Sequence, residues 1–124
     1  MSDKRRTETD IMIEVLKALY DLPGVWVYRN NCGVAKPPGA SRAIRFGLPG
    51  QADLSGIVQV TTPRGVLGVR LEVEVKTPTG KISPEQVAFG ARITEMGGCY
   101  ILARSANEAV RALTAWRKDL EDGN

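Results

Sequence analysis

The chain has 124 residues, of which 43 % are hydrophobic, and this favours one globular domain with a modest core. Histidine is absent, which excludes Ser-His-Asp and Cys-His triads, histidine general bases and HExxH zinc sites. The net charge is +3, and there is neither an apolar leader nor an apolar run of about 18 residues. We therefore expect no membrane span and no secretory signal, and a cytoplasmic protein.

Residues 7–22 have the spacing of an amphipathic helix, which Pro23 and Gly24 end. Its apolar positions are Ile11, Met12, Val15, Ala18, Leu19 and Leu22. Glu8 precedes this stripe by three and four residues, so we expect its carboxylate to point inward at the edge of the core. Glu14 belongs to the polar face, where we expect it to be solvated.

The next elements are short and rich in β-branched and aromatic residues. We predict strands over residues 25–28, 43–46 and 53–60, a loop over residues 30–41 and a turn over residues 47–50. Trp26 and Tyr28, together with Trp116 near the C-terminus, are interpreted as core residues rather than stacking platforms. Cys32 lies in the polar loop, whereas Cys99 opens an apolar run and is expected to be buried. We expect no disulfide between them, and two isolated cysteines cannot form a cysteine-rich zinc site.

The segment between Leu22 and Ala52 contains no acidic residue. It carries four cations, Arg29, Lys36, Arg42 and Arg45, and residues 4–6 add a basic start. A local positive field of this kind suits a polyanion such as nucleic acid. The alternative is an ordinary solvated surface on a slightly basic protein.

Residues 66–76 form the clearest predicted strand, because apolar and charged residues alternate along it. Its charged face carries Glu72, Glu74 and Lys76. A turn over residues 62–65 precedes this strand, and a loop over residues 77–81 follows it.

The C-terminal third predicts a helix, a strand and a helix. The first helix begins at Ser83, with Pro84 at its first position and Gln86 at its third, and runs to about Met96 before two glycines. Residues 99–103 form a short apolar strand. A capping box over residues 105–108 opens the last helix, whose apolar face holds Val110, Leu113, Trp116 and Leu120.

This order of elements predicts an α/β fold, with helices packed on a mixed β-sheet. The first strands are joined by turns and should pair antiparallel, whereas the strand after the second helix should return parallel. We see no linker that divides the chain. We therefore expect one domain over residues 1–124, with tails at residues 1–6 and 121–124.

Asp53, Glu74 and Lys76 together offer the most complete chemistry in the chain. Two carboxylates are hard oxygen ligands for Mg²⁺, and an ammonium beside them can face a water or a phosphate. With Glu8, three carboxylates would gather at one end of the sheet and repel one another unless a cation neutralises them. The alternatives are a turn or capping role for Asp53 and an exposed strand face of cross-strand ion pairs for Glu74 and Lys76.

Five further residues accompany this set. Glu72 is interpreted as an ion-pair partner of Arg70 or of a neighbouring strand rather than as a metal ligand. Gln86 has two interpretations: it completes the helix cap, or it points its amide at the phosphate or a metal-bound water. Lys81, Arg42 and Arg45 are expected to contact phosphates rather than to act as catalysts.

Three blocks of the sequence resemble the virus-type replication-repair nuclease (VRR-NUC) domain of the PD-(D/E)xK nuclease superfamily. They are residues 47–54 (GLPGQADL), 71–76 (LEVEVK) and 81–86 (KISPEQ). The resemblance implies a restriction-endonuclease-like core, a central mixed sheet flanked by helices, and Mg²⁺- or Mn²⁺-dependent hydrolysis of DNA phosphodiester bonds. One departure is Ala52, which stands where the family often has proline.

The resemblance also implies roles for individual residues. Asp53 and Glu74 would bind metal, Val75 would add its backbone carbonyl, and Lys76 would orient the attacking water. Glu8 and Gln86 match the glutamate of the family's first helix and its downstream glutamine.

Stand-alone domains of this size are similar to phage-type enzymes that act as homodimers on branched DNA, including Holliday junctions, so a phage or bacterial origin fits. Two other functions stay open. One is a catalytically silent nucleic-acid-binding module that uses the basic segment. The other is an oligomeric scaffold whose charged strand pairs with a partner.

Overall fold

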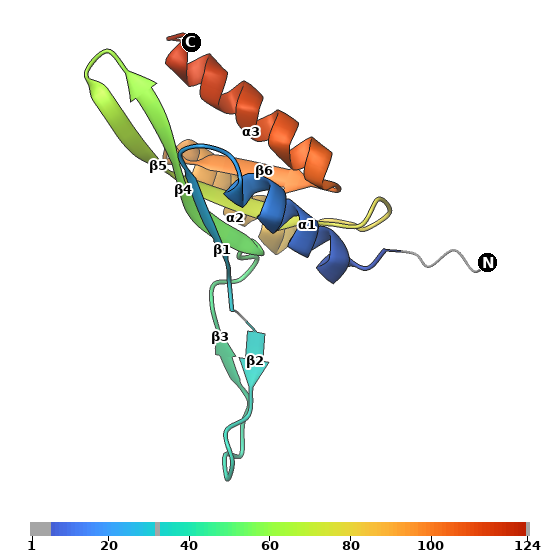
Figure 1. Cartoon of the computed structure of the whole chain (residues 1–124). Helices are drawn as coiled ribbons and strands as arrows, with labels where there is room; N and C mark the ends of the chain where they lie inside the picture. The colour runs from blue at the N-terminus through green and yellow to red at the C-terminus, as the bar shows by residue number, and fades with distance from the viewer. Residues whose placement is uncertain (1–5, 32, 124) are drawn as a thin grey trace, which may run out of the picture.

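The computed structural model describes residues 6–31 and 33–123, with the backbone alone at residues 33–35, 45 and 46. Three helices and six strands follow one another in the order shown in Figure 1. They are α1 (Glu8–Tyr20), β1 (Val25–Arg29), β2 (Gly33–Ala35), β3 (Ile44–Phe46), β4 (Leu54–Thr62), β5 (Gly65–Val75), α2 (Pro84–Glu95), β6 (Cys99–Ala103) and α3 (Ala106–Glu121). None of the helices in this part of the chain has the length and apolar character that a membrane crossing requires.

The main sheet has the strand order β1-β4-β5-β6. β1 pairs antiparallel with β4 and β4 antiparallel with β5, whereas β6 pairs parallel with β5. α1 and α3 lie on one face of this sheet and α2 lies on the other (Figure 1). The predicted α/β fold with a mixed sheet flanked by helices is therefore confirmed.

One part of the prediction is wrong, because residues 30–41 are not all loop. β2 pairs antiparallel with β3 in a separate two-stranded sheet, and a turn between Pro37 and Ala40 closes the connection. The pairing partner of β2 lies beyond this turn, so local composition alone did not reveal the strand. Figure 1 shows the pair projecting from the body as an arm (residues 33–46) that leaves the sheet where β1 ends and β4 begins.

The root of the arm is fastened to the body by Asn30. Its backbone N–H donates to the carbonyl of Asp53 at 2.8 Å. Its side-chain amide donates to the carbonyl of Ala52 at 2.8 Å and to the hydroxyl of Ser55 at 2.7 Å. The segment that leaves β1 and the segment that enters β4 are thus held together beside Asp53.

The core lies between the sheet and the pair of helices α1 and α3. It takes alternate residues of each strand, because successive side chains of a strand point to opposite faces. Its fully buried members include Val15, Leu19, Leu54, Val58, Leu71, Val73, Val75 and Leu113. Trp116 packs against this cluster, as predicted, and Cys99 is a buried free thiol whose pKa burial raises to about 12.

Trp26 and Tyr28 are not core residues, so that prediction is wrong. Val25 and Val27 occupy the core positions of β1, which leaves the two aromatic side chains on the other face of an edge strand. Trp26 is 55 % exposed and Tyr28 is 46 % exposed. The alternation along β1 was visible in the sequence, but it did not reveal that no helix of the described residues covers the second face of this strand.

The second face of the sheet is covered by α2, which packs on β6. The close approach occurs at Gly90, where an added Cβ would lie 2.5 Å from the Cε1 atom of Tyr100. The same ring meets Phe89 edge-on, with the ring centroids 6.5 Å apart. An added Cβ at position 90 would therefore force the Tyr100 ring or α2 to shift.

We predict that Gly90→Ala destabilises the fold by about 1–3 kcal/mol, because the new methyl group overpacks against the Tyr100 ring. Alanine is intrinsically better than glycine in a helix by about 1 kcal/mol, so helix propensity alone predicts the opposite sign. Urea unfolding followed by circular dichroism measures the change. Gly90→Ala combined with Tyr100→Leu should recover most of the loss, whereas a single variant as stable as the wild type would contradict the close contact.

Candidate metal centre

Three carboxylates from distant parts of the chain meet at one point. Glu8, Asp53 and Glu74 each offer one oxygen atom, and these oxygens all lie within 4.8 Å of one another. Glu8 stands in the first turn of α1, Asp53 directly before β4, and Glu74 near the end of β5. Oxygen ligands of a divalent cation lie about 2.0–2.6 Å from the ion, so ligand oxygens around one ion have this spacing.

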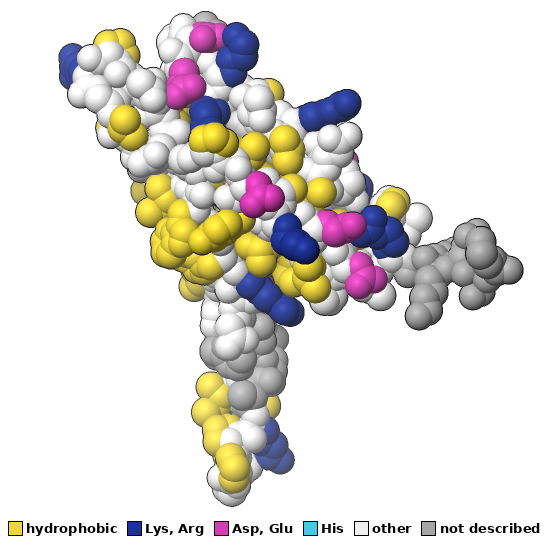
Figure 2. All heavy atoms as spheres, viewed as in Figure 1, with side chains coloured by type: hydrophobic (Ala, Val, Ile, Leu, Met, Phe, Trp, Pro, Cys, Tyr) yellow, Lys and Arg dark blue, Asp and Glu magenta, His cyan; other side chains and the backbone are white. Residues whose placement is uncertain are grey.

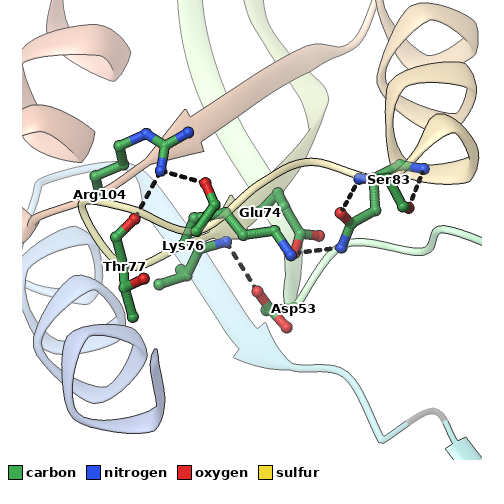
Figure 3. A network of polar contacts seen from close by, with 9 residues as sticks. Asp53, Glu74, Lys76, Thr77, Ser83 and Arg104 are labelled. Carbon is green, nitrogen blue, oxygen red and sulfur yellow. Dashed lines mark hydrogen bonds and ion pairs between the residues drawn. The ribbon is translucent and has the colours of Figure 1, made fainter. Parts of the chain in front are cut away.

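Asp53 is held by the strand that carries the other ligand candidate. Its Oδ2 atom accepts a hydrogen bond from the backbone N–H of Val75 at 2.8 Å (Figure 3). The same strand continues into Lys76, whose N–H donates to the carbonyl of Ala103 on β6 at 3.0 Å. Asp53 therefore keeps a fixed position relative to Glu74. The structure shows the N–H of Val75 in use, and the ligand role of its carbonyl stays a prediction.

Glu74 is the buried member of the group, with 1 % of its surface exposed. Its Oε1 atom accepts a hydrogen bond from the Gln86 amide at 2.9 Å and lies 3.9 Å from the Lys76 ammonium. Its Oε2 atom is also buried but has no hydrogen-bond partner. A buried carboxylate oxygen without a donor is costly, and a cation or a proton at that atom would compensate for the cost.

The surroundings of Glu74 raise its pKa to about 8. Burial is the largest cause, followed by the charge of Asp53 and by a hydrogen bond that the protonated carboxyl of Glu74 can donate to Asp53, and Glu8 adds a smaller repulsion. Lys76 acts in the opposite direction. The site as it stands therefore favours a bound proton on Glu74, and a divalent cation would compete for the same carboxylate.

Gln86 fulfils the capping role and also contacts the carboxylate group. Its Oε1 atom accepts from the N–H of Ser83 at 2.9 Å, and its backbone N–H donates to the Ser83 hydroxyl at 3.1 Å. The remaining amide nitrogen is free to donate to Glu74. The two interpretations of this residue are thus compatible, although the amide is directed at a carboxylate rather than at a phosphate.

The loop that leads into Asp53 rests on the first turn of α2. Gly50 has a φ angle of +72°, and a Cβ there would lie 2.1 Å from the carbonyl oxygen of Glu85. The N-terminal turn of α2 therefore contacts both sides of the site, Asp53 through its loop and Glu74 through Gln86. The first turn of α2 therefore helps to fix Asp53 and Glu74 relative to each other.

Lys76 is largely buried beside Glu74, with 13 % of its side chain exposed. The loop after it is held by Arg104, whose Nη1 atom donates to the carbonyls of Thr77 at 2.6 Å and Gly80 at 2.7 Å (Figure 3). Sequence reasoning missed Arg104, because nothing local distinguishes it from a surface arginine. Its two hydrogen bonds tie the loop after Lys76 to the end of β6.

Glu72 is completely buried and pairs with Arg70 at 3.2 Å, so its interpretation as an ion-pair partner is confirmed. The alternative of an exposed strand face is wrong for Glu74, which is 1 % exposed, and for Lys76, whose side chain is 13 % exposed. The reason is that residues 71–75 lie at the covered end of β5, where all five side chains are buried.

Glu8 is exposed, so the expectation that it points inward at the edge of the core is wrong. It precedes the first buried residue of α1, Ile11, by almost a full turn, and its carboxylate reaches the site from the helix end. Glu14 is exposed and pairs with Arg6, as its place on the polar face predicted.

The cations predicted to contact phosphates lie outside this group. Arg29, Lys36, Arg42 and Lys81 are exposed, on the end of β1, on the arm and on the loop before α2. The side chain of Arg45 and the whole of Cys32 lie outside the described part of the structure. The structure therefore places four of the five predicted phosphate contacts at the surface.

Tyr100 is a residue that the sequence did not single out. Its hydroxyl is buried without a hydrogen-bond partner. Burial, and to a smaller degree the charges of Glu74, Asp53 and Glu72, raise its pKa to about 12. Its position in an apolar strand gave no signal of a polar environment, which α2 and the carboxylates create around it.

The residues present fit a divalent cation. Three hard oxygen donors lie at ligand spacing, one of them has an unpartnered buried oxygen, and the donors repel one another without a cation. A cation bound here would satisfy the free oxygen of Glu74 and offset the repulsion.

Comparison with solved structures supports the fold. The chain resembles a structure described as "VRR_NUC domain protein", with a TM-score of 0.56 and 15 % sequence identity. The match covers 93 % of this chain and 91 % of that chain. No protein-family model matches the sequence, and no curated protein matches it. At this identity the likeness shows a shared fold, which is the VRR-NUC-like fold that the sequence predicted.

We predict that metal-free protein loses stability as the pH rises, because the folded state holds the Glu74 proton more tightly than the unfolded state. The pKa is about 8 in the folded protein against an ordinary value of 4.5. This contribution is fully present below the lower value and is lost as the pH rises through the upper one. Glu74→Gln has no group that titrates at this position, so it should not lose this stability as the pH rises. The variant should therefore become more stable than the wild type near pH 8 in EDTA. Thermal unfolding between about pH 5 and pH 9 measures the difference.

A divalent cation should make the wild type more stable than Glu74→Gln at pH 8, the reverse of the order in EDTA. Added Mg²⁺ should raise the melting temperature of the wild type at pH 8, have little effect at pH 5, where protons compete, and leave Glu74→Gln unchanged. Glu95→Gln, an exposed glutamate of α2, serves as the control and should follow the wild type. If the melting temperatures of the wild type and Glu74→Gln changed in parallel with pH, this would contradict a proton bound to Glu74 in the folded protein.

Proposed function

We propose that the protein is a Mg²⁺- or Mn²⁺-dependent DNA endonuclease of the VRR-NUC type that hydrolyses phosphodiester bonds. The observation that carries the proposal is the meeting of Glu8, Asp53 and Glu74 within 4.8 Å, with the Lys76 ammonium beside them. The likeness of the fold to a VRR_NUC domain protein supports it. In this proposal the whole chain acts as one nuclease domain.

The chemistry of the site follows from what its residues can do. A divalent cation, when bound, would lower the pKa of a water and neutralise charge on the scissile phosphate. Asp53 and Glu74 would hold it in a fixed geometry, since Val75 orients the first and Gln86 the second. Glu8 and the carbonyl of Val75 would complete the ligand set.

Lys76 would place a positive charge next to the attacking water. Its ammonium lies 3.9 Å from Glu74, close enough to orient a water at the site and to stabilise negative charge as it develops on the phosphate. The chain contains no histidine, so a histidine base is not an option. Gln86 would act as a positioning residue for Glu74.

We further propose a branched DNA substrate, such as a Holliday junction, cut by a homodimer. Two copies would place two sites on two strands, as the resemblance to phage-type enzymes implies. Exposed cations on the arm and near its root, Arg29, Lys36 and Arg42, with Arg45 and Lys81, would contact the DNA backbone. The DNA backbone carries one negative charge per nucleotide, which complements the positive charge of this acid-free segment.

We predict that Asp53→Asn and Lys76→Ala each reduce cleavage of a four-way junction by at least about a hundredfold in Mg²⁺ or Mn²⁺. The reason is that the first removes a ligand charge and the second removes the stabilising ammonium. Gel electrophoresis of labelled strands measures the rates. Glu95→Gln and Lys17→Ala are matched controls at exposed positions and should cleave like the wild type. Full activity in either folded site variant would rule out the assignment, and metal-independent binding without cleavage would favour a silent binding module.

We also predict that the arm contributes to affinity through its charge. The double variant Lys36→Ala/Arg42→Ala should bind duplex DNA more weakly, with similar losses for unrelated sequences. The slope of log affinity against log salt concentration should fall by about one for each phosphate contact that is lost. Fluorescence anisotropy in EDTA at several salt concentrations measures this. Lys17→Ala/Arg92→Ala, which removes two exposed cations of α1 and α2, is the control, and an equal loss there would assign the effect to net charge alone.

A further inference from the structure

We propose that Trp26 and Tyr28 form an aromatic platform on which unpaired bases stack beside the candidate metal centre. The favoured substrate would then carry single-stranded nucleotides next to the scissile phosphate, as a flap or a splayed branch does. This inference rests on the proposed nuclease function and narrows its substrate class.

The first argument is the exposure of the two rings. Trp26 and Tyr28 occupy alternate positions of β1, and each exposes about half of its surface. Their ring centroids lie 5.0 Å apart with an angle of 49° between the planes, so they form one contiguous surface. Aromatic side chains on an open sheet face are the kind of surface on which successive bases of single-stranded nucleic acids stack.

The second argument is the position of the platform relative to the metal centre. Tyr28 pairs with Ser55 of β4, and Ser55 pairs with Glu72 of β5. Directly opposed residues of antiparallel strands share a face, so the platform lies on the face that carries Glu72 and Glu74. Asp53 stands two residues from Ser55, which is about 6.8 Å along the strand. A base on Tyr28 would thus belong to a nucleotide close to the phosphate at the carboxylates.

The third argument is that this half of the face is open. α2 packs over β6, on the side of the sheet away from β1. Ile57 pairs with Trp26 and is 44 % exposed, so it extends the apolar surface by one strand. Figure 2 shows hydrophobic side chains gathered beside β1, on the body just above the arm. A strand of nucleic acid can therefore lie on the platform without moving an element of the fold.

The charges around the platform match a nucleic acid. Arg70 pairs with Ile57, two strands from Trp26, and its side chain is 58 % exposed on the same face. The arm, with Lys36 and Arg42, begins beyond the end of β1. Bases would meet the rings while these cations face the phosphates.

A second copy of the chain fits this surface less well. Buried aromatic side chains contribute about 150–250 Å² each, so two half-exposed rings and Ile57 offer on the order of 300 Å². A stable protein interface needs roughly 800 Å² from each partner. A protein partner on this half of the sheet would also obstruct the way to the carboxylates on the same face.

The test compares binding of two DNA molecules in EDTA, so that no cleavage occurs. One is a fork with unpaired arms, and the other is the same sequence fully paired. Trp26→Ala and Tyr28→Ala should each weaken binding of the fork by about tenfold, within the range known for loss of one stacked base, and should leave the paired duplex within about twofold. Trp26→Phe and Tyr28→Phe should retain most of the affinity, because they keep a ring.

Tyr20→Ala is the matched control, since Tyr20 is an exposed tyrosine of α1 on the opposite side of the sheet. It should bind both DNA molecules like the wild type. In the wild type, titration with the unpaired oligonucleotide should quench tryptophan fluorescence, and the quenching should disappear in Trp26→Ala, which retains Trp116. Unchanged fork affinity, an equal loss for fork and duplex, or no quenching would overturn the platform.

Three further results separate a failure of this inference from a failure of the proposed function. If Asp53→Asn abolishes cleavage while the platform variants bind and cut the fork normally, the nuclease stands and the platform fails. If Trp26→Ala converts a dimer into a monomer in sedimentation analysis, the surface belongs to a second copy and the inference is wrong. If the wild type neither binds nor cuts DNA, the proposed function itself fails.

Discussion

The structure depends on keeping three carboxylates together, one of which, Glu74, is buried. Glu74 is almost fully enclosed, and its neighbours Asp53 and Glu8 repel it, so the fold must hold the group against its own electrostatics. It does so with directed hydrogen bonds, from the backbone of Val75 to Asp53 and from the amide of Gln86 to Glu74. A proton or a divalent cation at Glu74 relieves the repulsion that remains, which explains why the same residues suit metal chemistry.

α2 is the element that converts a charged strand into a site. Its first turn caps itself through Ser83 and Gln86, reaches Glu74 with the spare amide of Gln86, and supports the loop before Asp53 at Gly50. Its middle approaches the sheet at Gly90. Because the helix covers only the β6 side of this face, the carboxylates are partly enclosed while the β1 side stays open.

The proposed function uses both halves of this sheet face, the half under α2 and the open half at β1. In the enclosed half the side chains of Glu74 and Lys76 are largely buried, which strengthens the electrostatic interaction between them. The open half presents two aromatic rings and leads to the root of a basic arm, which Asn30 fastens beside Asp53. Metal chemistry and nucleic-acid contact can therefore lie next to each other without a separate binding domain.

Several features were determined by the sequence itself. Alternation along residues 66–76 predicted the central strand, and capping residues at Ser83 and Ser105 predicted two helix starts. The carboxylates at Asp53 and Glu74 were recognisable because, with Lys76, they form the set of two hard oxygen ligands and one ammonium that a divalent cation and a phosphate require. The gathering of Glu8 with them was predicted from their joint chemistry and from the resemblance to a known domain.

Only the tertiary structure decided which faces are covered. A period of two predicts that a strand has two different sides, but a helix from elsewhere in the chain determines whether the second side is enclosed. For that reason Glu72 and Glu74 are buried although they alternate like surface residues, and Trp26 and Tyr28 are exposed although they are aromatic. The pairing of β2 with β3 was likewise hidden, since a three-residue strand is stabilised by its partner rather than by its own composition.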